Sequence, residues 1–210
     1  MSFKRVIGFL LLFIGALVIA IPFILDWYND NKANMLLKEY SKSITNLTIL
    51  DDESDSSSDT KNETIQSESN LQIQKQYPVE TVLSIPKINF QMPVIKDATK
   101  AHLNVSISSI NGTAKPWEKG NYVIAGHRSL RYGRHFNRLN EVAVNDEIIV
   151  FDMKNNEYHY RVNSTEIVSK REVSVLKNTK ADEITLITCD PIYEKNPQNR
   201  LVVKAIKLAD

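Results

Sequence analysis

Residues 6–25 contain no charged side chain, and this apolar stretch limits the architecture of the chain more than any other feature. A helix rises about 1.5 Å per residue, so twenty residues span roughly 30 Å, the thickness of the hydrocarbon core of a bilayer. Lys4 and Arg5 precede the stretch, and Asp26 and Asp30 follow it. The positive-inside rule therefore predicts a cytoplasmic N-terminus and an exported remainder.

Two other interpretations of this stretch fit less well. A cleavable signal peptide has a shorter apolar core that ends in small residues, whereas Ala20 is followed by Ile21, Pro22 and further apolar residues. A buried helix of a soluble protein normally keeps one polar face, and residues 6–25 have none. We therefore predict an uncleaved transmembrane signal anchor.

A second segment, residues 51–70, has the opposite character. It carries seven acidic residues against one lysine, and Ile65 is its one large apolar side chain. Such a segment cannot bury enough surface to offset its ordering entropy, which predicts a solvated tether. The predicted organisation is a cytoplasmic N-terminus (1–5), the anchor (6–25), an extracellular stalk with an acidic linker (26–76) and one folded domain (77–210).

Charge and cysteine content exclude two classes of protein. The net charge of +1 gives no electrostatic footprint for nucleic acid, and a single cysteine cannot cross-link the chain internally. Cys189 is therefore a buried small hydrophobe, an intermolecular link or a reactive thiol.

The folded domain contains eight short apolar runs of strand length, rich in β-branched and aromatic residues and separated by turn signals. They cover 82–85, 90–95, 122–125, 148–151, 158–162, 166–168, 184–189 and 201–208. Helical patterns occur only at 99–109 and 135–140. This pattern predicts an all-β fold, a closed or nearly closed eight-stranded barrel with one or two short helices.

Cys189 stands at the end of one predicted strand, directly before Asp190 and Pro191. A thiol at a strand end can reach a cleft, although a free cysteine is often only a core residue. Nucleophilic catalysis needs a partner that helps to form the thiolate and then protonates the leaving amine, and histidine suits both tasks.

Among the four histidines, His127 is the best match because the apolar strand at 122–125 delivers it to a sheet edge, next to Gly126. His102 and His159 have surface patterns, and His135 lies in a basic loop. A purely structural role for His127 stays open.

Arg200 opens the last predicted strand, and a loop of ten residues, 190–199, separates it from Cys189. If these two strands are neighbours, the guanidinium and the thiol share one rim, where the arginine can stabilise an oxyanion during acyl transfer. An arginine at a strand start is otherwise a solvated charge.

Three motifs in this order resemble the sortases, the membrane-anchored cysteine transpeptidases of Gram-positive bacteria. TLITC at 185–189 is similar to the family's TLxTC signature, GNYVIAGH at 120–127 to its histidine motif, and NRLVV at 199–203 to its arginine strand. The resemblance covers residues 80–208 and also the layout with an anchor in front. It does not distinguish class A from class D.

The resemblance implies an eight-stranded sortase barrel and a two-step acyl transfer. Cys189 would attack an LPXTG-like sorting signal of a secreted protein between Thr and Gly, and an amine of a cell-wall precursor would release the product. His127 would act as general acid and base, Arg200 would stabilise the oxyanion or position the signal, and Thr188 would add a hydrogen bond to the substrate.

No cofactor is expected, because no His and Cys cluster has zinc-like spacing. Some class A sortases bind calcium through loop carboxylates, and Glu172, Asp182 and Glu183 lie in the corresponding region, so calcium stays open. Two alternative functions also stay open. One is an extracytoplasmic cysteine peptidase that hydrolyses its acyl enzyme, and the other is a non-enzymatic, membrane-tethered binding barrel.

Overall fold

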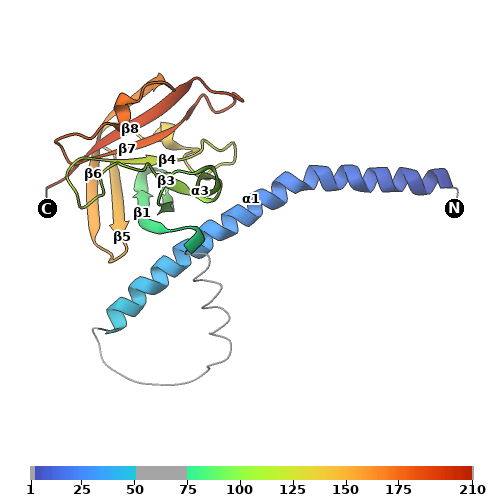
Figure 1. Ribbon diagram of the computed structural model, residues 1–210, viewed down its shortest axis with the longest axis horizontal. Helices are drawn as coiled ribbons and strands as arrows, with labels where there is room; N and C mark the ends of the chain where they lie inside the picture. The colour runs from blue at the N-terminus through green and yellow to red at the C-terminus, as the bar shows by residue number, and fades with distance from the viewer. Residues whose placement is uncertain (1–2, 51–74, 210) are drawn as a thin grey trace.

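The computed structural model describes residues 3–50 and 75–209, which form a long N-terminal helix and a β-barrel (Figure 1). The predicted acidic linker at 51–70 lies outside the described residues. The division of the chain into anchor, stalk and catalytic domain remains a prediction.

Helix α1, Phe3–Leu50, contains the whole apolar stretch, with Pro22 inside it. Its segment Phe9–Lys42 is long and apolar enough to cross a membrane, with a mean hydropathy of 2.6 in its most apolar window. That window makes no buried contact with the rest of the protein. The N-terminal half of α1 projects away from the barrel, whereas the later part runs beside it (Figure 1).

Eight strands close into a barrel in the order β1-β2-β3-β4-β7-β8-β6-β5, which confirms the predicted fold class. Their bounds are Val79–Ile85 (β1), Phe90–Ile95 (β2), Ile107–Ser109 (β3), Asn121–Ala125 (β4), Glu147–Asp152 (β5), Glu157–Ser169 (β6), Glu183–Asp190 (β7) and Asn199–Lys207 (β8). The helical elements of the barrel are short: Lys100–Val105 (α3), Pro86–Ile88 (η1), Leu139–Glu141 (η2) and Ser174–Leu176 (η3). Most strand pairs are antiparallel, but β4 runs parallel to β7 and β3 parallel to β2.

The eight observed strands differ from the eight predicted ones at two places. The runs at 158–162 and 166–168 belong to one long strand, β6, whose register shifts between Val162 and Ser164. β3 lies within the segment that was expected to be helical over 99–109, because α3 ends at Val105 and the chain then extends. At 135–140, only a short 3-10 turn forms.

The barrel core consists of the inward-facing residues of all the long strands, in agreement with strand alternation. Tyr122, Tyr160 and Phe136 are the largest of its fully buried side chains.

A second apolar cluster joins α1 to the barrel. Ala33 and Leu36 of α1 pack with Tyr77, Ile95 and Val105. Further along α1, the hydroxyl of Tyr40 donates a hydrogen bond to the carbonyl of Asp152 at 2.9 Å. Part of the segment that was expected to be an extracellular stalk is therefore bound to the barrel.

Candidate active site at the ends of β4 and β7

Cys189 and Arg200 lie directly opposite each other on the antiparallel strands β7 and β8. Because side chains alternate along a strand, and Leu186 and Leu201 point into the core, Cys189 and Arg200 share the outer face of the barrel. The thiol of Cys189 is half-buried rather than sealed in the interior. The pairing of β7 with β8, which the sequence left conditional, is thus present.

Strand β4 delivers His127 to the same end of the barrel. Ala125 is opposite Ile187 in the parallel β4–β7 ladder, and the amide of Gly126 donates to the carbonyl of Ile187 at 3.0 Å. The hydroxyl of Thr188 donates to the carbonyl of Gly126 at 2.8 Å. His127 comes next in the chain, so it leaves β4 where β7 ends.

Arg128, which follows His127, and Asp190, which follows Cys189, form an ion pair. Nη1 of Arg128 contacts Oδ1 of Asp190, and these side chains are only 9% and 18% exposed. His127 and Cys189 therefore lie between two links from β4 to β7, the bond of Thr188 on one side and this ion pair on the other. Nothing in the local sequence around either residue indicates this pair.

The ring of His127 stacks on that of His135, with 6.1 Å between the centroids and an interplanar angle of 23°. His127 itself is exposed, whereas His135 is only 3% exposed and its Nε2 lies 3.3 Å from the carbonyl of Val105. The packing around the His127 ring lowers its pKa, and the positive charge of Arg134 lowers it further. This environment favours the neutral imidazole, the form that can accept a proton.

The side chain of Arg200 is turned toward its own loop. Its Nη1 donates to the carbonyl of Pro197 at 3.0 Å and to that of Asn199 at 2.8 Å. Its contacts in this structure are therefore with backbone oxygens, which are the same kind of acceptor as a substrate carbonyl.

The other candidate residues occupy different positions. Thr188, expected to bond the substrate, is 2% exposed and uses its hydroxyl on Gly126, as described above. His102 lies 2.7 Å from the carbonyl of Asp97, and His159 lies 2.9 Å from a carboxylate oxygen of Glu147. Both histidines are thus held by contacts on other parts of the barrel.

A cleft of about 840 Å³ lies beside His127, and one of its walls is α1. Phe23, Asp26 and Trp27 of α1 face Leu130 and Arg131 of the loop that follows β4. The contact between α1 and this loop was not predicted from the sequence. The spacing of Asp26 and Asp30, which puts both carboxylates on one face of a helix, was the available signal.

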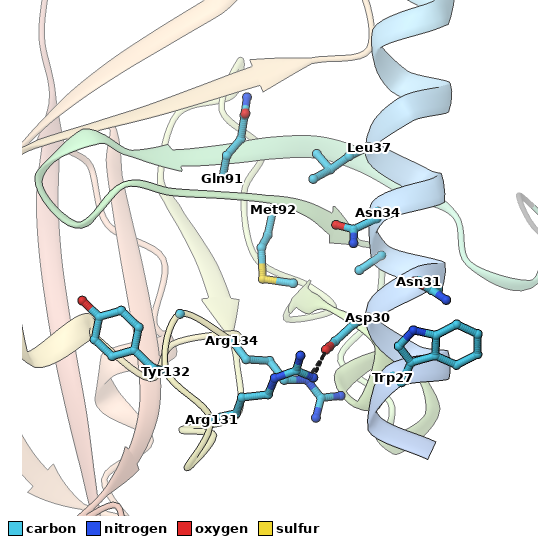
Figure 2. Close-up of a pocket in the computed structure, with 12 residues that line it drawn as sticks. Trp27, Asp30, Asn31, Asn34, Leu37, Gln91, Met92, Arg131, Tyr132 and Arg134 are labelled. Carbon is cyan, nitrogen blue, oxygen red and sulfur yellow. Dashed lines mark hydrogen bonds and ion pairs between the residues drawn. The ribbon is translucent and has the colours of Figure 1, made fainter. Parts of the chain in front are cut away.

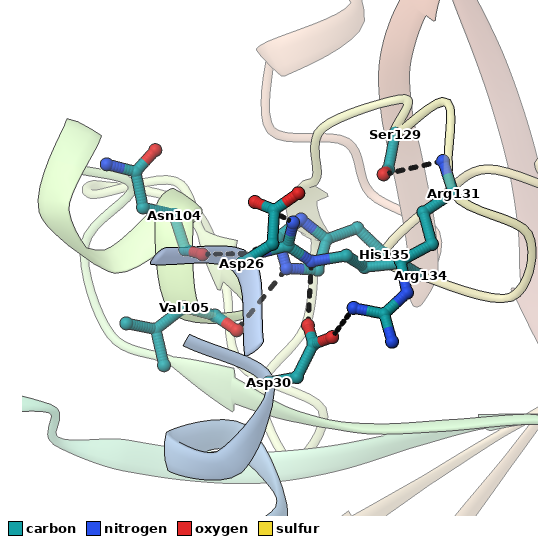
Figure 3. Close-up of polar contacts among 8 residues, drawn as sticks. All are labelled: Asp26, Asp30, Asn104, Val105, Ser129, Arg131, Arg134 and His135. Atoms are coloured by element: carbon teal, nitrogen blue, oxygen red, sulfur yellow. Dashed lines mark hydrogen bonds and ion pairs between the residues drawn. The ribbon is translucent and has the colours of Figure 1, made fainter. Parts of the chain in front are cut away.

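Ion pairs hold α1 against this loop. Arg134 contacts Asp26 at 2.6 Å and Asp30 at 2.8 Å, and Arg131 also pairs with Asp30. Figure 2 shows Asp30 directed at the guanidinium groups of Arg131 and Arg134, and Figure 3 shows Asp26 and Asp30 arranged around Arg134. His135 lies behind Arg134 in the same cluster (Figure 3).

Within residues 3–50 and 75–209, no three His, Cys, Asp or Glu side chains gather in a way that could hold a metal ion.

Comparison with known proteins identifies one family. A family model described as the sortase domain matches residues 83–208. Sortase A of Bacillus anthracis is 32% identical over 121 residues, which cover 58% of this chain and 56% of that protein. Sortase D of Bacillus subtilis is 27% identical over 149 residues, which cover 70% of this chain and 73% of that protein.

Solved structures give the same result. Sortase A of Listeria monocytogenes superimposes with a TM-score of 0.58 at 30% identity, covering 62% of this chain and 88% of that structure. A Clostridium perfringens sortase D5 transpeptidase shares the fold, with a TM-score of 0.58 at 22% identity, covering 80% of this chain and 98% of that structure. The sequence matches span about half the length of the sortase A proteins of B. anthracis and L. monocytogenes.

Proposed function

Because this chain belongs to the sortase family, we propose that it is a membrane-anchored cysteine transpeptidase acting on secreted proteins with a C-terminal, LPXTG-like sorting signal. The enzyme cleaves the signal between Thr and Gly and transfers the new acyl group to an amine of the cell wall. α1 anchors it in the bacterial cell membrane by a single pass, with the N-terminus in the cytoplasm and the barrel outside.

The reaction proceeds in two balanced steps. The neutral ring of His127 takes the proton of the Cys189 thiol, and the resulting thiolate attacks the threonine carbonyl. The Thr–Gly bond then breaks, and the protonated His127 gives that proton to the departing glycine amine. The acyl group is then a thioester on Cys189. An incoming amine attacks this thioester, and His127 takes the proton of the amine. The C–S bond breaks as the product amide forms, and His127 returns the proton to the sulfur of Cys189.

Arg200 stabilises the negative charge that develops on the carbonyl oxygen in both steps. Its register opposite Cys189 supports this role, because a guanidinium on the neighbouring strand is within reach of a carbonyl held at the sulfur. Its bonds to the carbonyls of Pro197 and Asn199 have to be exchanged for bonds to the substrate. Binding of the signal is therefore expected to move the side chain of Arg200.

One observation carries the proposal: three separate strands converge at one end of the barrel. The half-buried thiol of Cys189 is one residue before the end of β7, and Arg200 lies opposite it near the start of β8. His127 follows β4 by two residues, and its lowered pKa favours the neutral ring. A nucleophile, a base and an oxyanion donor are the groups that acyl transfer needs.

One experiment distinguishes a transpeptidase from a peptidase and from a binding protein. The detergent-solubilised full chain is incubated with an LPXTG peptide, with and without triglycine as the amine. A transpeptidase forms the peptide–triglycine ligation product, a peptidase releases only the acid, and a binding barrel leaves the peptide intact. We expect ligation, and the acid as sole product with triglycine present would refute the transfer step.

Variants test the roles of individual residues. Cys189→Ala abolishes the ligation, and His127→Ala lowers it by at least about a hundredfold, as expected for loss of general acid–base catalysis. His159→Ala is the matched control, because His159 is bound to Glu147 and Glu157 on the β5–β6 hairpin. Equal losses in the two histidine variants would contradict the assignment of His127.

A further inference from the structure

The loop that follows β4 carries exposed apolar and cationic side chains beside the membrane helix. Leu130 is 70% exposed and Tyr132 is 75% exposed, while the side chain of Arg131, between them, is 57% exposed. The guanidinium of Arg138 lies over the Tyr132 ring, 4.8 Å from its centre, and Arg131 pairs with Asp30, but most of the surface of the three side chains stays exposed. Their combination of apolar, aromatic and cationic groups is typical of a surface that lies in the interface of a bilayer.

The docking of α1 fixes the height of this loop relative to the apolar stretch. Leu130 lines the same cleft as Phe23 and Trp27, so it lies level with the end of the stretch at 6–25. The ion pairs from Asp26 and Asp30 to the loop hold it there. The loop therefore cannot move far along α1 while these contacts persist.

The position of the loop along α1 gives its depth in the bilayer. Asp30 is five positions beyond Leu25 in α1, which is about 8 Å along a helix axis. The headgroup layer on each side of a hydrocarbon core is about 5–8 Å thick. The turn of α1 that binds the loop thus falls within the headgroup layer, and Trp27, at 61% exposure, occupies the position where interfacial tryptophans are enriched.

The charges at this level fit a phosphate-rich surface. Asp26 and Asp30 alone would be repelled by anionic headgroups. Arg134 pairs with both carboxylates, however, and Arg131 pairs with Asp30. Arg131 stays more than half exposed in its ion pair, so its guanidinium can also bind a lipid phosphate.

We propose that Leu130, Arg131 and Tyr132 form a second membrane contact, which docks the barrel on the phospholipid surface. Leu130 and Tyr132 lie among the headgroups and upper acyl chains, and Arg131 binds phosphate. Since His127 lies in the same loop, three residues before Leu130, and lines the same cleft, the docked barrel opens this side of its site toward the bilayer. The contact is additional to the anchor, and it rests on α1 crossing the membrane.

Site-directed spin labelling tests this contact without using activity. Cys189→Ala removes the only cysteine, and single cysteines are then introduced and labelled in the full chain. The protein is reconstituted into vesicles of phosphatidylcholine and phosphatidylglycerol in a three-to-one ratio. The collision rates of each label with oxygen, which concentrates in lipid, and with a polar nickel chelate, which stays in water, report its depth.

The key label is at Leu130→Cys, and the matched control is Val173→Cys. Val173 has a similar exposure of 66%, but it adjoins η3, whose Val175 binds the side chain of Asn121 at the opposite end of β4. We expect an oxygen-to-nickel collision ratio roughly tenfold higher at position 130 than at position 173, as for a group at the hydrocarbon boundary. Equal ratios would overturn the proposal.

Two further variants make the result unambiguous. A label at Leu17→Cys, inside the apolar stretch, tests the anchor on its own, so a lipid signal at 17 without one at 130 refutes only the docking. A label at 130 that neither oxygen nor nickel reaches means that protein covers the loop, which also refutes lipid contact. In the double variant Asp26→Asn, Asp30→Asn, the ratio at 130 should fall toward that at 173, and an unchanged ratio would exclude the ion pairs as its cause.

Discussion

Arg128 and Asp190 form an ion pair between the residues that directly follow His127 and Cys189. The pair lies across the ends of two parallel strands that belong to different parts of the sequence. Because both side chains are mostly buried, neither charge can be left to solvent if its partner is lost. The pair therefore contributes both to stability and to the relative position of the histidine and the cysteine.

Asp190→Asn should leave the buried guanidinium of Arg128 without a counter-charge. We expect a loss of about 3 kcal/mol in the free energy of unfolding and a fall of about tenfold to a hundredfold in kcat, since small displacements of reacting groups are costly. Urea unfolding and the ligation assay measure the two effects. Glu166→Gln, in the surface pair with Lys204, is the control and should cost about 1 kcal/mol or less. Similar losses in both variants would argue against a special role for the buried pair.

Gly126 has a packing role that its place before His127 does not reveal. A Cβ added at this position would lie 2.6 Å from Cδ2 of Phe136 and 2.8 Å from Cγ2 of Ile107. Gly126→Ala should therefore destabilise the barrel by about 1–3 kcal/mol through overpacking, and it should lower activity by displacing His127. Thermal unfolding and ligation rates test both effects. Adding Phe136→Leu makes room for the methyl group, so the double variant should recover part of the stability, and a further loss would contradict the steric explanation.

The rate of the proposed reaction should depend on the pKa of His127. The packing of neighbouring groups around the ring and the charge of Arg134 lower this pKa, so the neutral imidazole persists below the usual midpoint near about 6.5. The acidic limb of kcat/KM should therefore lie below this value, with a maximum at mildly alkaline pH. A profile that is flat from about pH 5 to about pH 10 would contradict the assignment of a thiol and an imidazole.

Removal of the charge at Arg134 should shift this acidic limb. In Arg134→Gln, the cation that disfavours protonation of His127 is gone, and Asp26 loses its partner nearby, so the limb moves to higher pH. Arg131→Gln is the control because Arg131 does not contribute to the pKa of His127. A shift to lower pH in Arg134→Gln would refute the electrostatic explanation.

The local pattern of the sequence predicted most of the barrel, and it placed Cys189, His127 and Arg200 at the ends of strands. Strand alternation and turn signals gave β2 with its observed bounds and β7 and β8 to within a residue or two. β3 was missed because its three residues follow a helical segment without a turn signal between them. β6 was divided because the bulge after Val162 interrupts its alternation. Local patterns of this kind indicate the periodicity of apolar residues along an element, but they do not indicate which strands pair.

Contacts between distant segments could not be predicted in the same way. The ion pair of Arg128 with Asp190 joins residues 62 positions apart, and the pair of Arg134 with Asp26 spans 108 positions. The local sequence around a charged residue does not indicate which distant residue it pairs with. Both pairs became apparent only when the strand order and the docking of α1 were known.

The stability of the barrel should itself depend on pH through His135, which is almost fully buried. Burial, and then the charge of Arg134, lowers the pKa of His135 to about 4. In the unfolded chain the same group titrates near about 6.5, so between these values the unfolded state binds the additional proton and is stabilised by it. Stability should therefore fall as the pH decreases through this range, by up to about 3 kcal/mol, and this contribution should level off below the folded pKa.

His135→Gln removes this titration while an amide can still reach the carbonyl of Val105. The variant should lose less stability than the parent between pH 7 and pH 4.5, measured by urea unfolding at each pH. His159→Gln is the control with the opposite sign, because Glu147 and Glu157 raise the pKa of His159. Protonated His159 stabilises the fold at acidic pH, and this contribution is lost as the pH rises through its folded pKa. The free energy of unfolding of His159→Gln should therefore fall more steeply toward acidic pH than that of the parent. If it fell less steeply in His159→Gln than in His135→Gln, the buried histidine would not be responsible for the pH dependence.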